Sequence, residues 1–376
     1  MTVKTALITG GAGFIGSRLA RALLEHGYRV RVLDNLLPQV HGKERQFPAH
    51  LDPRVETLLG DICDPSAVTR ALRGVDVVYH LAALTGVGQS MYQVDEYTRV
   101  NVGGTSTLLQ CLIDRGQNLD RLVLASSRAV YGEGKYRCVN CGPVYPTSRP
   151  VAQLDAHQWD LACPTCGSTI EAELTDERSP CSPASVYAIT KQTQEELVRC
   201  VGAAYGFPAA VLRFFNVYGA GQAPSNPYTG LIITFLSRLV RGEPLDLYED
   251  GQMQRDFVHV NDVVAACVAA AERPQAVGQC LNVGTGERVT VEQVAHTLID
   301  LTGVPVEARR TPVARVGDVR HVVADIRQAR ERLGYAPRVS LREGLSDLID
   351  WFRSQTDQAD RTVQARAELQ KHSLLR

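Results

Sequence analysis

Hydrophobic and polar positions follow two alternating periods along the first part of the chain. Short apolar runs are typical of buried strands, and apolar positions three or four residues apart predict helices. We expect strands at 5–9, 29–34, 55–60, 75–81, 121–126 and 209–214, and helices at 14–26, 65–73, 101–115 and 185–204. Strands that alternate with helices predict an α/β fold, with a doubly wound parallel sheet covered by helices on both faces.

The alternation of strands and helices is interrupted once by an insertion and stops again after residue 215. We therefore expect three further units: the insertion, a C-terminal lobe and a tail. Residues 136–173 carry several prolines and two cysteine pairs and show no long helical or strand period, so we interpret them as an inserted lobe. Residues 1–135 and 174–215 then form the first domain. Residues 216–353 contain shorter elements and are expected to form mainly a smaller C-terminal substrate lobe. The polar tail, 354–376, is expected to be a solvated helix or a frayed end without a function.

Composition and charge exclude several classes of partner. The 376 residues carry a formal net charge of −1, and no basic block is present. We therefore expect no nucleic acid and no membrane surface as a partner. The sequence shows neither an apolar run of membrane-spanning length nor a signal peptide at its start, so a cytoplasmic location is expected.

A glycine-rich turn follows the first strand, where TGGAGFIGS spans residues 9–17. Gly10, Gly13 and Gly16 lie between an apolar strand and an apolar-periodic helix, the context of a dinucleotide site. Side chains here would keep a pyrophosphate away from the amides at the helix N-terminus. A plain tight turn is the alternative explanation of the glycines taken alone.

The second expected strand ends at Asp34, 18 residues after Gly16. A carboxylate in this place accepts hydrogen bonds from the ribose hydroxyls and repels a 2′-phosphate. Asn35 and Leu36 follow without an adjacent arginine, so NAD is favoured over NADP. Together with the glycine turn, Asp34 predicts a Rossmann-type NAD site, and Asp61 and Ile62 after the third strand are placed to meet the adenine.

A tyrosine and a lysine share one face of the helix at 185–204. Tyr187 and Lys191 are four residues apart, and a nearby ammonium group lowers the pKa of a phenol. The strand ending in Ser126 and Ser127 brings a hydroxyl to the edge of the sheet where ligands bind. The alternatives are a structural tyrosine stacked on a lysine stem and a serine that forms a turn.

These pieces resemble one family nearly end to end. The chain resembles the extended short-chain dehydrogenase/reductases, in their nucleotide-sugar epimerase/dehydratase branch. The similar stretches are TGGAGFIG, LDN (33–35), GDI (60–62), HLAA (80–83), RVNVGGT, SSRAVYG, YAITK, RFFNVYG (213–219), RDFVHVNDV (255–263), NVGTGE (282–287) and GDVRHVVAD (317–325).

The resemblance implies roles for particular residues. It implies that Tyr187 is the base, that Ser127 bonds the reacting hydroxyl, and that Lys191 holds the nicotinamide ribose. It also implies a nucleotide-sugar substrate, dTDP- or UDP-linked, at Ser127, Asn216, Arg255 and Arg320, and a homodimer through the helices near 101–115 and 187–203. The cofactor-binding set is Gly10, Gly13, Phe14, Ile15, Gly16, Asp34, Asn35, Asp61, Ile62, Leu81, Ala82, Ala83, Asn101, Tyr187 and Lys191.

One departure from the family narrows the reaction. The 4,6-dehydratases of this branch carry an Asp-Glu pair after their catalytic threonine, where this chain has Arg128 and Ala129. Elimination of water across the sugar C5–C6 bond lacks its acid and base here. An NAD-dependent 4-epimerase is therefore favoured. A reductase, dehydrogenase or decarboxylase of the same branch is the alternative, and a non-catalytic nucleotide-sensing or zinc-bridged binding protein is a distant third.

The insertion contains two C-x-x-C-G motifs, with Cys138, Cys141, Cys163 and Cys166. This spacing predicts a zinc-ribbon-like loop with structural Zn²⁺ on four thiolates. A redox motif, two disulfides or coincidence are the alternatives. The ends of the insertion flank the active site, so it is placed to form a wall over the sugar. The cysteine pairs and GVGQSMY at 86–92 are similar to those of rhamnose 4-epimerases, branch members that act on dTDP-linked 6-deoxy sugars.

Overall fold

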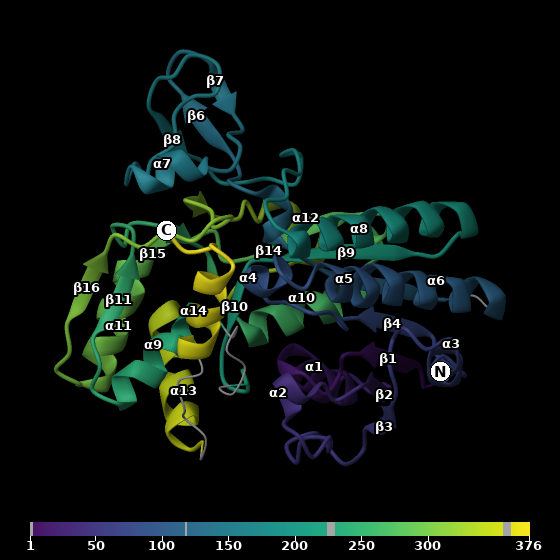
Figure 1. Ribbon diagram of the computed structural model, residues 1–376. Coiled ribbons are helices and arrows are strands. Elements are labelled where there is room, and N and C mark those ends of the chain that lie inside the picture. Colours follow the sequence, from purple (N-terminus) through teal and green to yellow (C-terminus); the bar gives the residue numbers. More distant parts are fainter. Residues whose placement is uncertain (1–2, 117–118, 224–229, 356–361) are drawn as a thin grey trace.

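The computed structural model describes residues 3–116, 119–223, 230–355 and 362–376, and a parallel sheet lies at its centre (Figure 1). Within these residues seven strands pair in the order β14-β9-β5-β4-β1-β2-β3, all of them parallel. The predicted α/β, Rossmann-type fold is confirmed. The strands are β1 (Thr5–Thr9), β2 (Arg29–Asp34), β3 (Glu56–Leu59), β4 (Val77–His80), β5 (Arg121–Ser127), β9 (Ala209–Phe214) and β14 (Cys280–Val283).

Helices cover both faces of this sheet because its strands are apolar on both sides. Ile8 and Val32 belong to the core on one face, and their neighbours Leu7 and Leu33 belong to the core on the other. The first face is covered by α1 (Phe14–Glu25), α10 (Val260–Glu272) and α12 (Arg327–Leu333). The second is covered by α3 (Pro65–Ala71), α6 (Gly104–Arg115) and α8 (Val186–Tyr205).

The second lobe has its own apolar core, but it takes less of the chain than expected. Its core joins α9 (Leu231–Val240), α11 (Val291–Thr302), α13 (Leu341–Arg353) and β11 (Leu245–Tyr248), with β16 (Ala308–Thr311) beside β11. Assigning residues 216–353 mainly to this lobe was too broad. α10, β14 and α12 return to the parallel sheet, because their apolar side chains pack into its core.

Short elements connect these units. Five short strands, arranged as one pair and one set of three, link the sheet to the second lobe, and several one- or two-turn helices follow the strand ends. They are β10 (Asn216–Tyr218), β12 (Gln254–Arg255), β13 (Phe257–His259), β15 (Val289–Thr290), β17 (His321–Val322), α2 (Pro38–His41), α4 (Val87–Ser90), α5 (Val94–Tyr97), the π-helix η1 (Thr98–Gly103), and the 3₁₀ turns η2 (Arg128–Tyr131) and η3 (Pro274–Ala276).

The insertion is a small separate layer at the top of Figure 1. It contains a three-stranded antiparallel sheet of β6 (Tyr136–Cys138), β7 (Gly142–Val144) and β8 (Ile170–Ala172), and the short helix α7 (Val151–Asp155). A backbone hydrogen bond of 2.8 Å from Glu173 N to Lys135 O closes its base. Its core consists of only Tyr136, Cys138, Val144, Cys163 and Ile170, and a core of this size rarely holds a lobe together alone.

The tail does not remain in solvent as expected. Residues 356–361 lie outside the described residues, and α14 (Thr362–Lys371) follows them. Ala365 and Leu369 of this helix are 6% and 4% exposed. The two residues are four positions apart, on one face of the helix. Two apolar positions in a polar segment are too few to predict a buried helix from the sequence. Among the described residues, no helix is both long enough and apolar enough to span a bilayer.

Candidate active site

A cavity of about 1100 Å³ opens at the carboxyl edge of the parallel sheet. One half of it lies over the turns that follow β1, β2, β4 and β5, and the other half is lined by α9, β11 and α14. Single-ligand sites usually measure about 300–1,000 Å³. The cavity is larger than this range, and its lining divides between the two halves.

The glycine turn forms a cradle that only glycine fits. Gly10 has a φ of +69°, and a Cβ there would lie 2.8 Å from the backbone of Ala82. A Cβ on Gly16 would lie 2.6 Å from the carbonyl oxygen of Gly10. The N-terminal end of α1, including Gly13, Phe14 and Ile15, therefore faces the cavity without side chains that cover its amides. This arrangement fits a pyrophosphate.

Asp34 is held in one orientation at the end of β2. Its Oδ2 accepts a hydrogen bond of 3.0 Å from Ala12 N, and its Oδ1 accepts one of 2.9 Å from Leu36 N. The neighbouring Asn35 donates to Asp61 at 3.2 Å. The predicted adenine and ribose residues line this part of the cavity together: Asp34, Asn35, Asp61, Ile62, Leu81, Ala82 and Ala83.

Asn101 is the one predicted cofactor residue that does not line the cavity. It is fully buried in the π-helix η1, where its Oδ1 accepts from Leu84 N at 2.8 Å. Its Nδ2 donates to Leu84 O at 3.1 Å and to Thr190 Oγ1 at 3.0 Å. Asn101 therefore ties the turn after β4 to helix α8, and it supports the cavity wall from behind.

Ser127, Tyr187 and Lys191 meet in the cavity, as predicted from their motifs. Ser127 ends β5, and α8 begins at Val186 after Ser185, whose side chain accepts from Ala188 N and caps the helix. Ser90, from the GVGQSMY stretch, accepts a hydrogen bond of 3.0 Å from Tyr187 N. Lys191 Nζ donates to the carbonyl oxygen of Ala125 at 2.9 Å. The catalytic helix is thus held at both its start and its second turn.

The charges around Tyr187 differ from those expected. Burial raises the pKa of Tyr187, while a hydrogen bond with Ser127 and the positive charge of Arg128 lower it. We expected Lys191 to lower this pKa. Instead burial lowers the pKa of Lys191 itself to about 8, and the positive charge that lowers the pKa of Tyr187 is that of Arg128. From the sequence, Arg128 indicated only that the acid of the dehydratases is absent at this position.

Arg128 and Ala129 line the cavity directly after Ser127. Burial and the nearby Arg255 lower the pKa of Arg128 to about 10. The positions that hold the Asp-Glu pair of the dehydratases therefore present a cation and a methyl group to the substrate.

Two arginines line the second half of the cavity, and one of them has a buried donor that no described residue accepts. Arg255 donates to Asp318 Oδ1 at 2.9 Å and to Val319 O at 2.6 Å, and it lines the cavity. Arg315, which we had not singled out, also lines it, and its Nε is buried without a hydrogen-bond partner among the described residues. Asn216 lines the cavity as expected, and its Oδ1 is likewise buried without a partner there.

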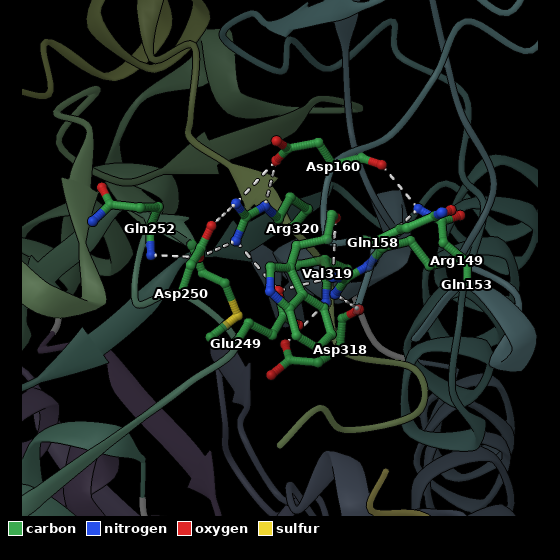
Figure 2. A network of polar contacts seen from close by, with 12 residues as sticks. Arg149, Gln153, Gln158, Asp160, Glu249, Asp250, Gln252, Asp318, Val319 and Arg320 are labelled. Carbon is green, nitrogen blue, oxygen red and sulfur yellow. Dashed lines mark hydrogen bonds and ion pairs between the residues drawn. The ribbon is translucent and has the colours of Figure 1, made fainter. Parts of the chain in front are cut away.

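Arg320, expected at the substrate, does not line the cavity and belongs to a network of polar contacts (Figure 2). Its guanidinium lies between Asp160 of the insertion, at 2.9 Å, and Asp250 of the second lobe, at 2.6 and 2.7 Å. It also lies 3.3 Å from the buried carboxylate of Glu249. Because Arg320 does not line the cavity and these acids hold its guanidinium, it is a structural link between the insertion and the second lobe and not a substrate ligand.

The insertion supports the cavity without lining it. None of the residues 136–173, all of them described, lines the cavity, so the expected wall over the sugar is wrong. Arg149 instead donates to Glu249 at 2.8 Å and to the carbonyl oxygen of Asp318 at 3.2 Å (Figure 2). Burial raises the pKa of Glu133, on the other side of Arg149, to about 7. The insertion thus contacts the backbone of Asp318, a residue that lines the cavity.

The four cysteines of the insertion converge. The Sγ atoms of Cys138, Cys141, Cys163 and Cys166 all lie within 4.8 Å of one another, and Cys138 and Cys166 are 3.6 Å apart. Each pair is followed by a glycine with a φ of +74°, which lets the backbone turn behind the sulfur atoms. Sulfur atoms bound tetrahedrally to zinc at about 2.3 Å would lie about 3.8 Å apart, so the cluster fits this metal.

Comparisons with known proteins agree with this geometry. The dTDP-L-rhamnose 4-epimerase of Burkholderia thailandensis is 37% identical over 94% of this chain and 96% of that protein. The structure of UDP-glucose 4-epimerase from Thermotoga maritima with UDP-glucose has 30% identity and a TM-score of 0.76, covering 94% of this chain and 100% of that one. UDP-glucuronic acid 4-epimerase from Bacillus cereus, in complex with UDP-glucuronic acid and NAD, has 26% identity and a TM-score of 0.75, covering 92% and 98%.

A family model described as the NAD dependent epimerase/dehydratase family matches residues 6–150 and 163–284. The gap between the two matched ranges falls inside the insertion, and the matched ranges include the glycine turn, Ser127, Tyr187 and Lys191. The chain belongs to the NAD dependent epimerase/dehydratase family.

Proposed function

We propose that this protein is an NAD-dependent 4-epimerase of nucleotide sugars. The observation that carries the proposal is the meeting of Ser127, Tyr187 and Lys191 with the glycine cradle in one cavity. When bound, NAD would accept a hydride from sugar C4 and return it to the opposite face. The 4-epimerase relatives described above favour this reaction over net oxidation or reduction.

The residues of this chain would handle the proton and hold the sugar. Tyr187 would take the proton of the C4 hydroxyl and return it, while Ser127 bonds the same oxygen. Lys191, held by Ala125, would bind the nicotinamide ribose. Arg128, whose charge lowers the pKa of Tyr187, would favour the phenolate at the moment of proton transfer.

The diphosphate of the substrate would be held by Arg255 and Arg315, with Asn216 beside them. Guanidinium groups match phosphate oxygens in pairs of hydrogen bonds. The buried, unpartnered Nε of Arg315 supports this assignment, because it can donate to a phosphate oxygen. Arg315 thus takes the place of Arg320, which the sequence had placed at the substrate.

Among possible substrates, we place a dTDP-linked 6-deoxy sugar first. The 37% identity to a dTDP-L-rhamnose 4-epimerase supports this choice. The GVGQSMY stretch supports it as well, because it is similar to that of rhamnose 4-epimerases and its Gly88 lines the cavity.

The reaction is tested by incubating the purified protein with dTDP-rhamnose, UDP-glucose and UDP-glucuronate without added cofactor. We expect the two C4 epimers of at least one sugar to approach equilibrium by NMR, with no accumulation of NADH. Stoichiometric release of NADH, or a strict need for added NAD(P)H, would assign a dehydrogenase or a reductase instead.

We further propose that the four cysteines hold one structural Zn²⁺. Four thiolates leave no coordination position for substrate, and the metal would stabilise a lobe whose apolar core is small. Reduced thiols agree with a cytoplasmic location, which is part of this proposal.

The zinc proposal predicts about one zinc per chain by elemental analysis. Cys138→Ser should release the metal and increase protease cleavage within residues 136–173 more than within the parallel sheet. Cys200→Ser is the matched control, because Cys200 is an exposed cysteine outside the cluster. Metal-free wild-type protein with unchanged activity and protease resistance would refute the site.

A homodimer through α6 and α8 also belongs to the proposal. The two helices contact each other and lie side by side at the right of Figure 1. Ile189 on α8 is 51% exposed and is available for such an interface.

A further inference from the structure

The segment of residues 362–376 crosses from one lobe of the molecule to the other beside the cavity. In Figure 1 helix α14 lies between the lobe that carries β11 and α11 and the region of α4. Val363, Ala365, Arg366 and Leu369 of this helix line the cavity. The family model ends at residue 284, so this wall lies outside the matched part of the chain.

One end of this segment docks on the nucleotide-binding domain. Leu369 is 4% exposed and seats on Gly88 of α4, where a Cβ would lie 3.0 Å from Leu369 Cδ2. The rings of Tyr92 and His372 stack with centroids 4.6 Å apart. The helix is thus packed against the same GVGQSMY stretch that holds the start of the catalytic helix.

The other end docks on the substrate lobe. Ala314 N donates to Arg376 O at 2.8 Å, Arg376 N donates to Ala314 O at 2.9 Å, and Val316 N donates to Leu374 O at 3.0 Å. These bonds form a short antiparallel pairing on both sides of Arg315. The segment therefore fixes the backbone that carries one of the two proposed diphosphate ligands.

Arg366 adds a charge to the same part of the cavity. The carboxylate of Asp246 on β11 is shared by Arg238 at 2.8 Å, Arg309 at 2.5 Å and Arg366 at 3.7 Å. Tyr248 lies two residues after Asp246, on the same face of β11. The guanidinium carbon of Arg315 lies 6.0 Å from the centre of the Tyr248 ring. Of the described residues that line this half of the cavity, four are arginines (Arg238, Arg255, Arg315 and Arg366) and two are acids (Asp246 and Asp318), so this half favours an anion.

We propose that residues 362–376 form the wall of the substrate half of the cavity and that Arg366 binds the nucleoside diphosphate part of the substrate. The inference rests on the proposed function, because it takes the anion to be a nucleotide sugar. It makes Arg366 a specificity-determining residue supplied by a segment that the sequence marks as a polar tail.

The test measures binding of free dTDP and UDP to the NAD-loaded protein by calorimetry. Arg366→Ala should weaken the binding of the preferred nucleotide about tenfold or more, as expected for loss of a charge-assisted hydrogen bond. Because Arg366 is about half-exposed, this variant should fold normally, and its NAD content should equal that of the wild type. Arg309→Ala is the matched control, since Arg309 pairs with the same carboxylate but does not line the cavity.

A second variant tests the wall apart from the charge. Leu369→Asp should unseat α14 from Gly88, weaken nucleotide binding to a similar degree and expose the segment to protease. If wild type binds dTDP or UDP and Arg366→Ala and Leu369→Asp bind them equally well, the inference is overturned while the proposed function stands. If wild type binds neither nucleotide, the proposed substrate class fails as well.

Discussion

Replacing Tyr187 by phenylalanine is expected to lower kcat by about 10²–10⁴-fold, the usual contribution of general acid-base catalysis. Tyr187 is the phenol that meets Ser127 in the cavity, and the substitution removes only the hydroxyl that takes the C4 proton. The ring that fills the space remains, so the fold and the bound NAD should be retained.

The matched control is Tyr205→Phe. Tyr205 ends the same helix, α8, and is 58% exposed, so loss of its hydroxyl should leave turnover unchanged. Steady-state kinetics and the NAD content of both variants distinguish the outcomes. Near-normal turnover of Tyr187→Phe would mean that another group is the base.

The largest expected loss of stability follows from breaking a buried ion pair beneath the active site. Arg213 donates to Glu195 at 2.9 and 2.6 Å, and the two side chains are 7% and 1% exposed. Arg213 also lies 4.6 Å above the ring of Tyr131, and Ser126 donates to Glu195. Arg213→Ala leaves the carboxylate buried without its cation, which costs about 3–5 kcal/mol.

Chemical denaturation measures this free energy of unfolding. Arg199→Ala is the control, because Arg199 pairs with Glu196 at 3.6 Å on the exposed face of the same helix, where such pairs contribute about 0–1 kcal/mol. Replacing both buried partners, as Arg213→Met with Glu195→Leu, should recover much of the loss. A change of less than about 1 kcal/mol for Arg213→Ala would contradict a tightly paired, buried Glu195.

Sequence patterns predicted the sheet and the centre of the site because those features depend on residues close together in the chain. Gly10 and Gly16 belong to one turn, Asp34 ends the next strand, and Tyr187 and Lys191 are one helical turn apart. The order of strands then brings Ser127 to the same edge. Each of these features repeats a local rule of backbone geometry.

The side-chain network around the insertion could not be predicted in this way. Arg320 meets Asp250 from 70 residues away, and Arg149 meets Glu249 and Asp318 from 100 and 169 residues away. Motif similarity places Arg320 near the substrate, whereas acids from two other segments turn it away from the cavity. The contact of Leu369 could not be predicted for a related reason, since its partner is a glycine in the distant helix α4.

In the proposed reaction a hydride leaves sugar C4 and returns to the other face within one active site. This reaction is tested most directly by following a deuterium at C4 of the nucleotide sugar that the protein converts, in ordinary water. We expect the C4 epimer to retain the deuterium at C4, as NMR and mass spectrometry would show. Loss of the deuterium to solvent during formation of the epimer would contradict the proposed mechanism.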